Sequence, residues 1–161
     1  MTDKMGYSNI DHVYELSENG RLAKKRGNKS TLDSTALHVL LYMAHKTYDW
    51  PPEQWQVERK VPARLYTLGW RGIAEALGMT ILSFEQMQSG EDTDAMKLAR
   101  ERTAKNRITT AFKDLAERGL IKQLYPQSLG KNAGYLLMIG DPAENREVEA
   151  WARRCLGLPE G

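Results

Sequence analysis

One segment of the chain, residues 94–118, combines side chains suited to contacting nucleic acid. It contains neither glycine nor proline, and we expect a single helix there. Polar residues without a carboxylate recur on one side of this helix: Arg102, Lys105, Asn106, Thr109, Thr110 and Lys113. A solvated helix surface usually mixes charges of both signs. Cations for phosphates and short polar groups for base edges are typical of a helix that reads DNA. A surface helix that is merely basic is the alternative interpretation.

The other side of the same helix is apolar. Its residues recur at steps of three and four: Ala104, Ile108, Ala111, Phe112 and Leu115. Gly119 follows where a helix commonly ends in a left-handed residue, and an apolar strand is expected to begin directly afterwards. The helix is therefore expected to pack on a core through one side and to present the polar side to solvent.

This order of elements resembles the winged helix-turn-helix family over residues 30–139. The resemblance is carried by residues 72–78 (GIAEALG) for the second helix, 107–115 for the third helix and 119–121 for entry into the wing. Residues 62–70 look like winged-helix proteins of actinobacterial phages and plasmids. The resemblance implies an α+β fold, mostly α, with a small β-hairpin wing. An inserted loop and a C-terminal helix would be added to it.

The resemblance also implies roles for individual residues. We expect Arg102, Asn106 and Thr109 to contact base edges in the major groove. Phosphate contacts are expected from a second set: Arg71, Lys105, Thr110, Lys113 and Lys131. Asn132 lies beside Lys131 at the expected tip of the wing and joins the candidate DNA-binding residues.

The distribution of charge supports a nucleic-acid partner more than the total does. The formal net charge is only +2. Residues 97–131 hold nine lysines and arginines against three acids, and residues 21–29 hold five against none. Acids gather before residue 95 and after residue 140. A nearly neutral total with a polarised surface is typical of a protein that places one side on phosphates.

Several functional classes are excluded by the composition and the motifs. The sequence of 161 residues, 41% of them apolar, has no membrane-length apolar run and no signal-peptide pattern, so we expect a cytoplasmic protein without membrane contact. Cys155 is the single cysteine, which excludes an internal disulfide. His38 and His45 lack the spacing of a zinc site. We find no phosphate loop, dinucleotide motif or nucleophile motif, and so predict no enzyme, no cofactor and no metal.

The segments before the candidate DNA-reading helix divide as follows. Residues 1–29 are expected to form a basic N-terminal arm, with a small hairpin near Val13 to Gly20 and a mobile or unstructured basic tail at 21–29. Residues 30–140 form the winged-helix domain, with helices at 31–46 and 69–78 and a short strand at 64–68. Residues 48–60 are an insertion with Trp50 and Trp55, which either folds over the core or contacts a protein partner. Residues 79–93 form a second insertion, with a helical turn at 81–87 and a helix cap at Asp92 or Thr93.

The segments after Gly119 are expected to form the wing and a last helix. Strands at 119–124 and 134–139 enclose a loop at 125–133. Residues 141–161 form the C-terminal helix, started by Asp141 and Pro142 and closed by Gly157. Its apolar stripe packs on the domain or makes a homodimer, and both alternatives stay open. The stripe consists of Val148, Trp151, Ala152, Cys155 and Leu156.

Taken together, the sequence predicts a sequence-specific double-stranded DNA-binding protein, which the resemblance suggests is a transcriptional regulator or repressor of a phage or mobile element. A replication initiator or accessory factor of a plasmid or phage is the first alternative. A protein-interaction module built on a winged-helix scaffold is the second.

Overall fold

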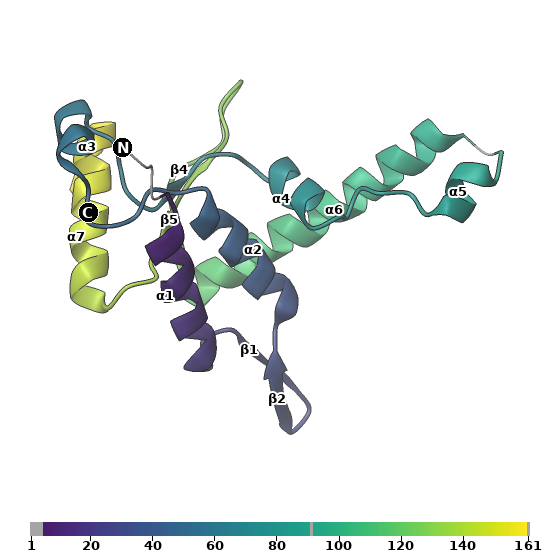
Figure 1. Ribbon diagram of the computed structural model, residues 1–161, viewed down its shortest axis with the longest axis horizontal. Helices are drawn as coiled ribbons and strands as arrows, with labels where there is room; N and C mark the ends of the chain where they lie inside the picture. The colour runs from purple at the N-terminus through teal and green to yellow at the C-terminus, as the bar shows by residue number, and fades with distance from the viewer. Residues whose placement is uncertain (1–4, 91, 161) are drawn as a thin grey trace.

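The computed structural model describes residues 5–90 and 92–160 and shows an α+β protein that is about half helical (Figure 1). The helices are α1 (Tyr7–Glu18), α2 (Ser34–His45), α3 (Gln54–Arg59), α4 (Arg71–Ala76), α5 (Phe84–Gln88), α6 (Thr93–Glu117) and α7 (Pro142–Leu156). The strands are β1 (Ala23–Arg26), β2 (Lys29–Leu32), β3 (Leu65–Tyr66), β4 (Ile121–Tyr125) and β5 (Gly134–Leu137). Within the described ranges, each helix is too short or too polar to cross a lipid bilayer.

The main core lies where α1, α2, α4 and the second half of α6 meet the sheet. Most of α2 is buried, as its broad apolar surface predicts. It begins at Ser34 rather than Thr31, because the Asp33 side chain accepts a hydrogen bond from the Ala36 backbone amide at 3.1 Å. The apolar stripe of α6 is buried in the same core, as expected.

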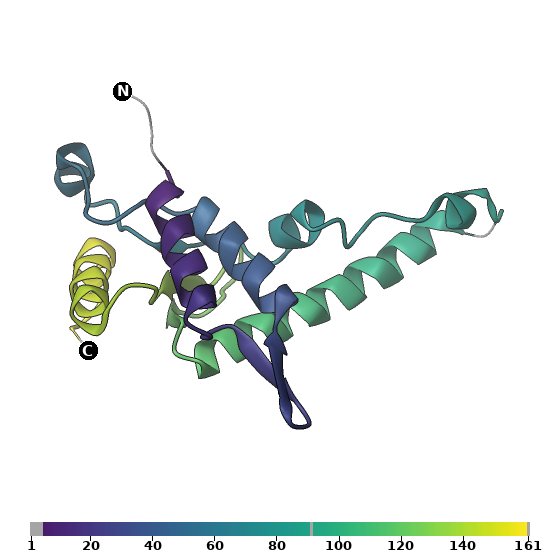
Figure 2. The same ribbon diagram turned by 60° about the horizontal axis from the view of Figure 1, so that its bottom comes forward.

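Helix α6 is long, and only part of it is in the core. Its first turn is capped by Asp92, whose Oδ1 accepts bonds from the amides of Asp94 (3.0 Å) and Ala95 (3.3 Å). Gly119 follows the helix with φ of 76°, in the expected left-handed conformation. The N-terminal half extends away from the body, with α5 near its far end (Figures 1 and 2). Arg100 donates to Gln86 Oε1 at 3.3 Å and joins α6 to α5.

Three strands form an antiparallel sheet in the order β3-β5-β4. Leu65 pairs with Leu136, and Ile121 pairs with Leu137. The sequence predicted a hairpin of two strands and a third short strand before the second helix, and the structure contains all three. The loop between β4 and β5 is itself ordered, because Ser128 and Lys131 exchange two backbone hydrogen bonds of 3.0 Å each.

The C-terminal helix α7 packs within the same chain. Asp141 caps it by accepting a bond from the Glu144 amide at 2.8 Å. Val148 and Ala152 are fully buried against Leu136 of the sheet. The Trp151 indole donates to the Val61 carbonyl at 3.0 Å. The intramolecular alternative for the apolar stripe is therefore what the structure shows.

The expectations for residues 1–29 were largely wrong. Residues 7–18 form helix α1 rather than a hairpin near Val13, because Ile10, Val13 and Leu16 recur at three-residue steps and pack toward the core. The basic tail is not an unstructured arm but the β1–β2 hairpin, which turns at Gly27 and Asn28. The main core continues across the expected boundary at residue 30. Residues 1–4, Glu91 and Gly161 lie outside the described residues.

The insertion at 48–60 folds onto the body and contains the short helix α3. The Trp55 ring meets the Tyr48 ring edge to face at 5.8 Å between centroids, and its Nε1 donates to Glu53 Oε2 at 2.7 Å. Trp50 packs against the cluster between α7 and the sheet. Both indoles thus have intramolecular partners, which favours the structural interpretation of the insertion; contact with a protein partner remains a prediction.

A single buried arginine ties these segments together. Arg64 has no exposed surface, and its Nε donates to Asn9 Oδ1 at 2.9 Å. Its Nη2 lies 2.8 Å from Glu144 Oε1 and forms an ion pair, although the geometry of this pair is not that of a hydrogen bond. Burial lowers the pKa of the Arg64 guanidinium, and the Glu144 carboxylate opposes that shift. Asn9 also donates to the Tyr48 carbonyl at 2.9 Å. Helix α1, the insertion, β3 and α7 therefore meet at one side chain.

A second ion-pair group on α7 gives a pH-dependent prediction. Burial raises the pKa of Glu149, but hydrogen bonds from Lys122 and Arg153 outweigh burial and hold that pKa below its ordinary 4.5. A carboxyl group with a lowered folded-state pKa stabilises the fold above its unfolded pKa, and this contribution is lost as pH falls through the folded value. We expect Glu149→Gln to lose stability at neutral pH and to show a weaker decline below about pH 4.5 than the wild type. Chemical unfolding across pH measures both effects. The exposed Glu147→Gln is the control, and an equal decline in all three proteins would contradict the prediction.

Candidate nucleic-acid interface

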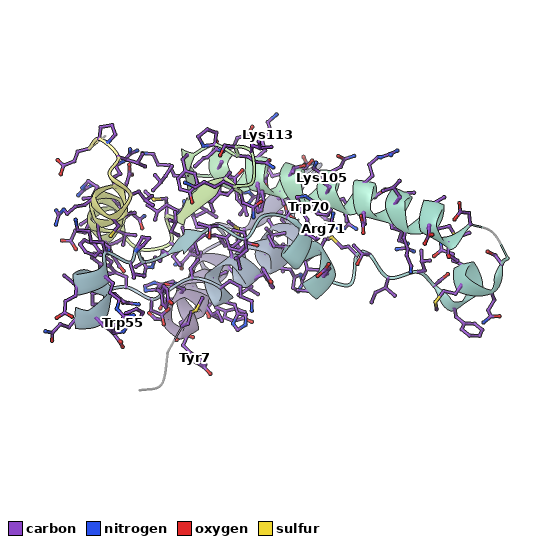
Figure 3. The ribbon with its side chains drawn as sticks, turned by 90° about the horizontal axis from the view of Figure 1, so that it is seen from above. Tyr7, Trp55, Trp70, Arg71, Lys105 and Lys113 are labelled. Atoms are coloured by element: carbon purple, nitrogen blue, oxygen red, sulfur yellow. The ribbon has the colours of Figure 1, made fainter. Side chains whose placement is uncertain are left out.

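The outer side of α6 is exposed from Arg102 to Lys113, the part of the helix that the sequence predicts to contact DNA. Arg102, Lys105, Asn106, Thr109, Thr110 and Lys113 are all exposed, while the stripe on the other side of the helix is buried. Within residues 5–90 and 92–160, Arg102, Lys105 and Lys113 make no ion pair. In Figure 3, Lys105 and Lys113 lie on α6, and Trp55 and Tyr7 lie well away from them. Among the described residues, α6 thus presents Arg102, Lys105 and Lys113 without a carboxylate partner, and Lys105 and Lys113 lie on the half of the helix whose opposite side is buried in the core.

The three uncharged polar residues of this surface differ in their surroundings. Asn106 and Thr110 line a groove of about 630 Å³ between α6, the start of α2 and β1. The Thr109 hydroxyl donates back to the Lys105 carbonyl at 2.8 Å, so its proton is used within the helix and its oxygen remains an acceptor. Asn106 makes no side-chain hydrogen bond with any described residue. Of the three, Asn106 therefore keeps its full donor and acceptor capacity for a ligand.

Arg71, at the start of α4, lies next to α6 but is already partnered. Its Nη1 forms an ion pair with Glu101 Oε1 at 3.2 Å, and its guanidinium lies over the Trp70 ring at 4.8 Å from the centroid. Figure 3 shows Trp70 and Arg71 beside α6. The sequence predicted a phosphate contact for Arg71 but not its ion pair with Glu101. A phosphate at Arg71 would compete with that carboxylate.

The β4–β5 loop projects from the sheet, at the top of Figure 1. The Lys131 ammonium lies 4.3 Å from the centroid of the Tyr125 ring, which holds the lysine without neutralising it. Asn132 donates to the Thr67 carbonyl at 3.2 Å and fixes the loop to the end of β3. Leu129 at the loop tip is fully exposed. Lys131 is therefore presented by an ordered loop, and Asn132 contributes to that order.

Two cations that enlarged the sequence-based charge count are neutralised within the chain. Arg118 pairs with Asp33 at 3.3 Å and with Asp114 at 3.0 Å. Lys122 pairs with Glu149 at 2.8 Å. The basic excess around α6 therefore comes from fewer residues than the sequence suggested. Asp114 is four residues from Arg118 on the same helix, whereas the pairs with Asp33 and Glu149 depend on long-range packing.

Arg107 is an exposed cation on α6 that was counted in the sequence-based charge excess but not predicted to bind DNA. It is exposed and lies between two grooves, the one shared with Asn106 and a second of about 770 Å³ that borders α4 and α5. It makes no ion pair with any described residue. The sequence contained a signal for this role: Arg107 follows Asn106 and stands three residues before Thr110, so it lies beside Thr110 on the surface of the helix.

In the part of the chain that the structure describes, His, Cys, Asp and Glu side chains do not gather in groups of three that would hold a metal ion. Comparison of the chain with protein-family models, with curated proteins and with solved structures gave no match in any of the three.

Proposed function

We propose that the chain is a winged helix-turn-helix protein that binds double-stranded DNA in a sequence-specific manner through the outer side of α6. The observation that carries the proposal is the exposed set of cations, amide and hydroxyls on a helix whose opposite side is anchored in the core. The arrangement of α2, α4 and α6 with a β3-β5-β4 sheet agrees with this family's order of elements. The proposal is therefore argued from the sequence and the structure of this chain alone.

The roles follow from the width of the DNA grooves. A major groove roughly 12 Å wide admits one α-helix with its side chains. With α6 in that groove, Arg102, Asn106 and Thr109 contact base edges, and Lys105, Thr110 and Lys113 reach phosphates at its borders. Lys131 on the β4–β5 loop contacts the neighbouring backbone or minor groove, as a wing does.

Lys113→Ala tests whether α6 contacts phosphates. Each phosphate contact contributes about 0.9 to the slope of log affinity against log salt concentration. We expect the variant to bind all duplexes more weakly and to lower that slope by about one unit. Titrations of a short random-sequence duplex at several salt concentrations measure this. Lys60→Ala, an exposed lysine beside α3, is the control.

An unchanged slope for Lys113→Ala would show that this residue touches no phosphate. Failure of the wild-type protein to retard random duplex at low salt and micromolar concentration would overturn DNA binding itself. That result would favour the alternative in which the same basic surface binds an acidic protein.

Within DNA binding, we propose regulation of transcription in a phage or mobile element, on the resemblance of residues 62–70. A regulator protects promoter elements, whereas a replication initiator protects repeated sites at an origin. Mapping the protected sites on DNA flanking its own gene distinguishes the two.

A second copy on a two-fold DNA site remains part of the proposal, because one small module gives limited contact area. Val148 and Ala152 are covered by the sheet. Only the partly exposed remainder of the α7 stripe, namely Trp151, Cys155 and Leu156, is left for a dimer. Sedimentation with and without DNA measures the number of copies.

A further inference from the structure

The β1–β2 hairpin carries a concentrated and unneutralised positive charge. Lys25, Arg26 and Lys29 are exposed, Lys24 is half-buried, and residues 19–32 contain no carboxylate. None of these four cations forms an ion pair with a residue in the described ranges. Gly27 and Asn28 form a two-residue turn that brings Arg26 and Lys29 into register. The cations are therefore concentrated toward the tip of a hairpin of about 13 Å, the length of four strand residues.

The hairpin is fixed to α6 rather than hanging from the body. An isolated two-stranded hairpin is marginally stable in water. Here Leu22, just before β1, is fully buried in the main core. Arg118, the residue after α6, donates from Nη1 to the carbonyls of Arg21 (3.1 Å) and Ala23 (2.7 Å), and its Nη2 reaches Asp33 at 3.3 Å. One guanidinium thus holds both ends of the hairpin against the end of α6.

A groove with a positive lining separates the hairpin from the outer side of α6. Lys24 lines it from β1, and Asn106, Arg107 and Thr110 line it from α6. Its two acids, Asp33 and Asp114, are both paired with Arg118. Lys24 and Arg107 remain unpaired with any described residue, so the groove is complementary to an anionic strand.

The hairpin and the β4–β5 loop project from the body in opposite directions, with α6 between them (Figure 1). Figure 2 shows the hairpin extending beyond α6. A helix that fills the major groove has one phosphate backbone on each side of it. Two basic projections flanking the helix are placed to reach one backbone each.

We infer that the β1–β2 hairpin binds the DNA backbone on the side of α6 opposite the β4–β5 loop, so that the protein holds both borders of the major groove. This inference rests on the proposed function and adds a contact surface that α6 and the β4–β5 loop do not supply. Its ligand chemistry is the row of phosphates of a duplex, contacted by Lys25, Arg26 and Lys29 at the tip and by Lys24 and Arg107 in the groove.

The test replaces three exposed cations of the hairpin together: Lys25→Gln, Arg26→Gln and Lys29→Gln. Their side chains form no hydrogen bond, ion pair or ring contact with a described residue that the substitutions would break. We expect the salt slope on random duplex to fall by about two to three units and affinity near physiological salt to fall about tenfold or more. A matched variant removes the same charge at the α3–α7 end: Lys60→Gln, Arg146→Gln and Arg154→Gln. It is expected to keep the wild-type slope.

Hydroxyl-radical footprinting then locates the contact. The hairpin variant is expected to lose protection on one backbone beside the α6 site, and Lys131→Gln on the other. The fold of each variant is checked by thermal unfolding, and an unfolding midpoint equal to that of the wild type shows that the fold is intact. A wild-type slope for the hairpin variant, an equal loss in the matched variant, or loss of the same footprint flank in both variants would overturn the inference. The proposed function survives each of these results, because it is tested separately by duplex binding of the wild-type protein and by the α6 variants.

Discussion

Replacing Arg64 by alanine is expected to lower the free energy of unfolding by about 3–5 kcal/mol. Removing the fully buried partner of an ion pair costs this much because the other charge, here Glu144 with 23% of its side chain exposed, stays largely buried without compensation. Here the substitution leaves the Glu144 carboxylate and the Asn9 side-chain oxygen without the guanidinium that joins them. It also opens a cavity where α1, β3 and α7 meet. Denaturant unfolding followed by circular dichroism measures the loss.

Three comparisons make the Arg64 experiment specific. Arg146→Ala, at an exposed position on α7, is the control and is expected to change stability by less than about 0.5 kcal/mol. Arg64→Met keeps most of the side-chain volume, so its difference from alanine separates packing from charge. Adding Glu144→Gln to Arg64→Met is expected to recover part of the loss, since the unpaired carboxylate is then gone. A loss below about 1 kcal/mol for Arg64→Ala would show that the segments hold together without it.

Asn106→Ala is expected to weaken binding to the cognate site by about 1–3 kcal/mol and to leave binding to random duplex nearly unchanged. The carboxamide is exposed and makes no internal hydrogen bond, so both its donor and its acceptor are available for a base edge. Alanine also favours the helix more than asparagine does, so the variant keeps α6 intact.

The cognate site for this measurement comes from selection out of a random DNA pool with the wild-type protein. Lys113→Ala serves as the comparison, because loss of a phosphate contact weakens both kinds of DNA alike. Equal losses on cognate and random DNA for Asn106→Ala would remove Asn106 from the base-reading set and leave the rest of the α6 surface as a general phosphate-binding face.

Local signals in the sequence were sufficient for the part of the fold that positions α6. The apolar stripe from Ala104 to Leu115 repeats with the period of a helix. Gly119 follows the end of α6 in a left-handed conformation, and Asp141 caps the start of α7 through its side chain. These features depend on neighbours a few residues away, so the sequence alone reveals them. The exposed positions of Asn106 and Lys113 follow directly from the buried stripe.

The features that sequence reasoning missed depend on partners far along the chain. Arg64 was expected only to begin a strand, because Asn9 and Glu144 lie some 55 and 80 residues away. Arg118 was counted as a surface cation because Asp33 and the carbonyls that it binds lie far away in sequence, although Asp114 is only four residues away. Helix α1 was missed because its apolar residues are few and its polar residues many, so that packing on α2 supplies most of its stability. The β1–β2 hairpin was missed because Arg118 and Leu22 hold it in place.

The long helix α6 has a further consequence for motion. All of its buried residues lie from Ala104 onward, so the eleven residues 93–103, about 16 Å of helix, have no core behind them. Their order depends on intrinsic helix preference, the Asp92 cap, the contact with α5 and the ion pair of Glu101 with Arg71. We therefore expect opening of this half to cost less free energy than opening of the half on the core. Arg102, at the inner end of this half, is therefore expected to be held in place less firmly than Lys113 before a ligand binds.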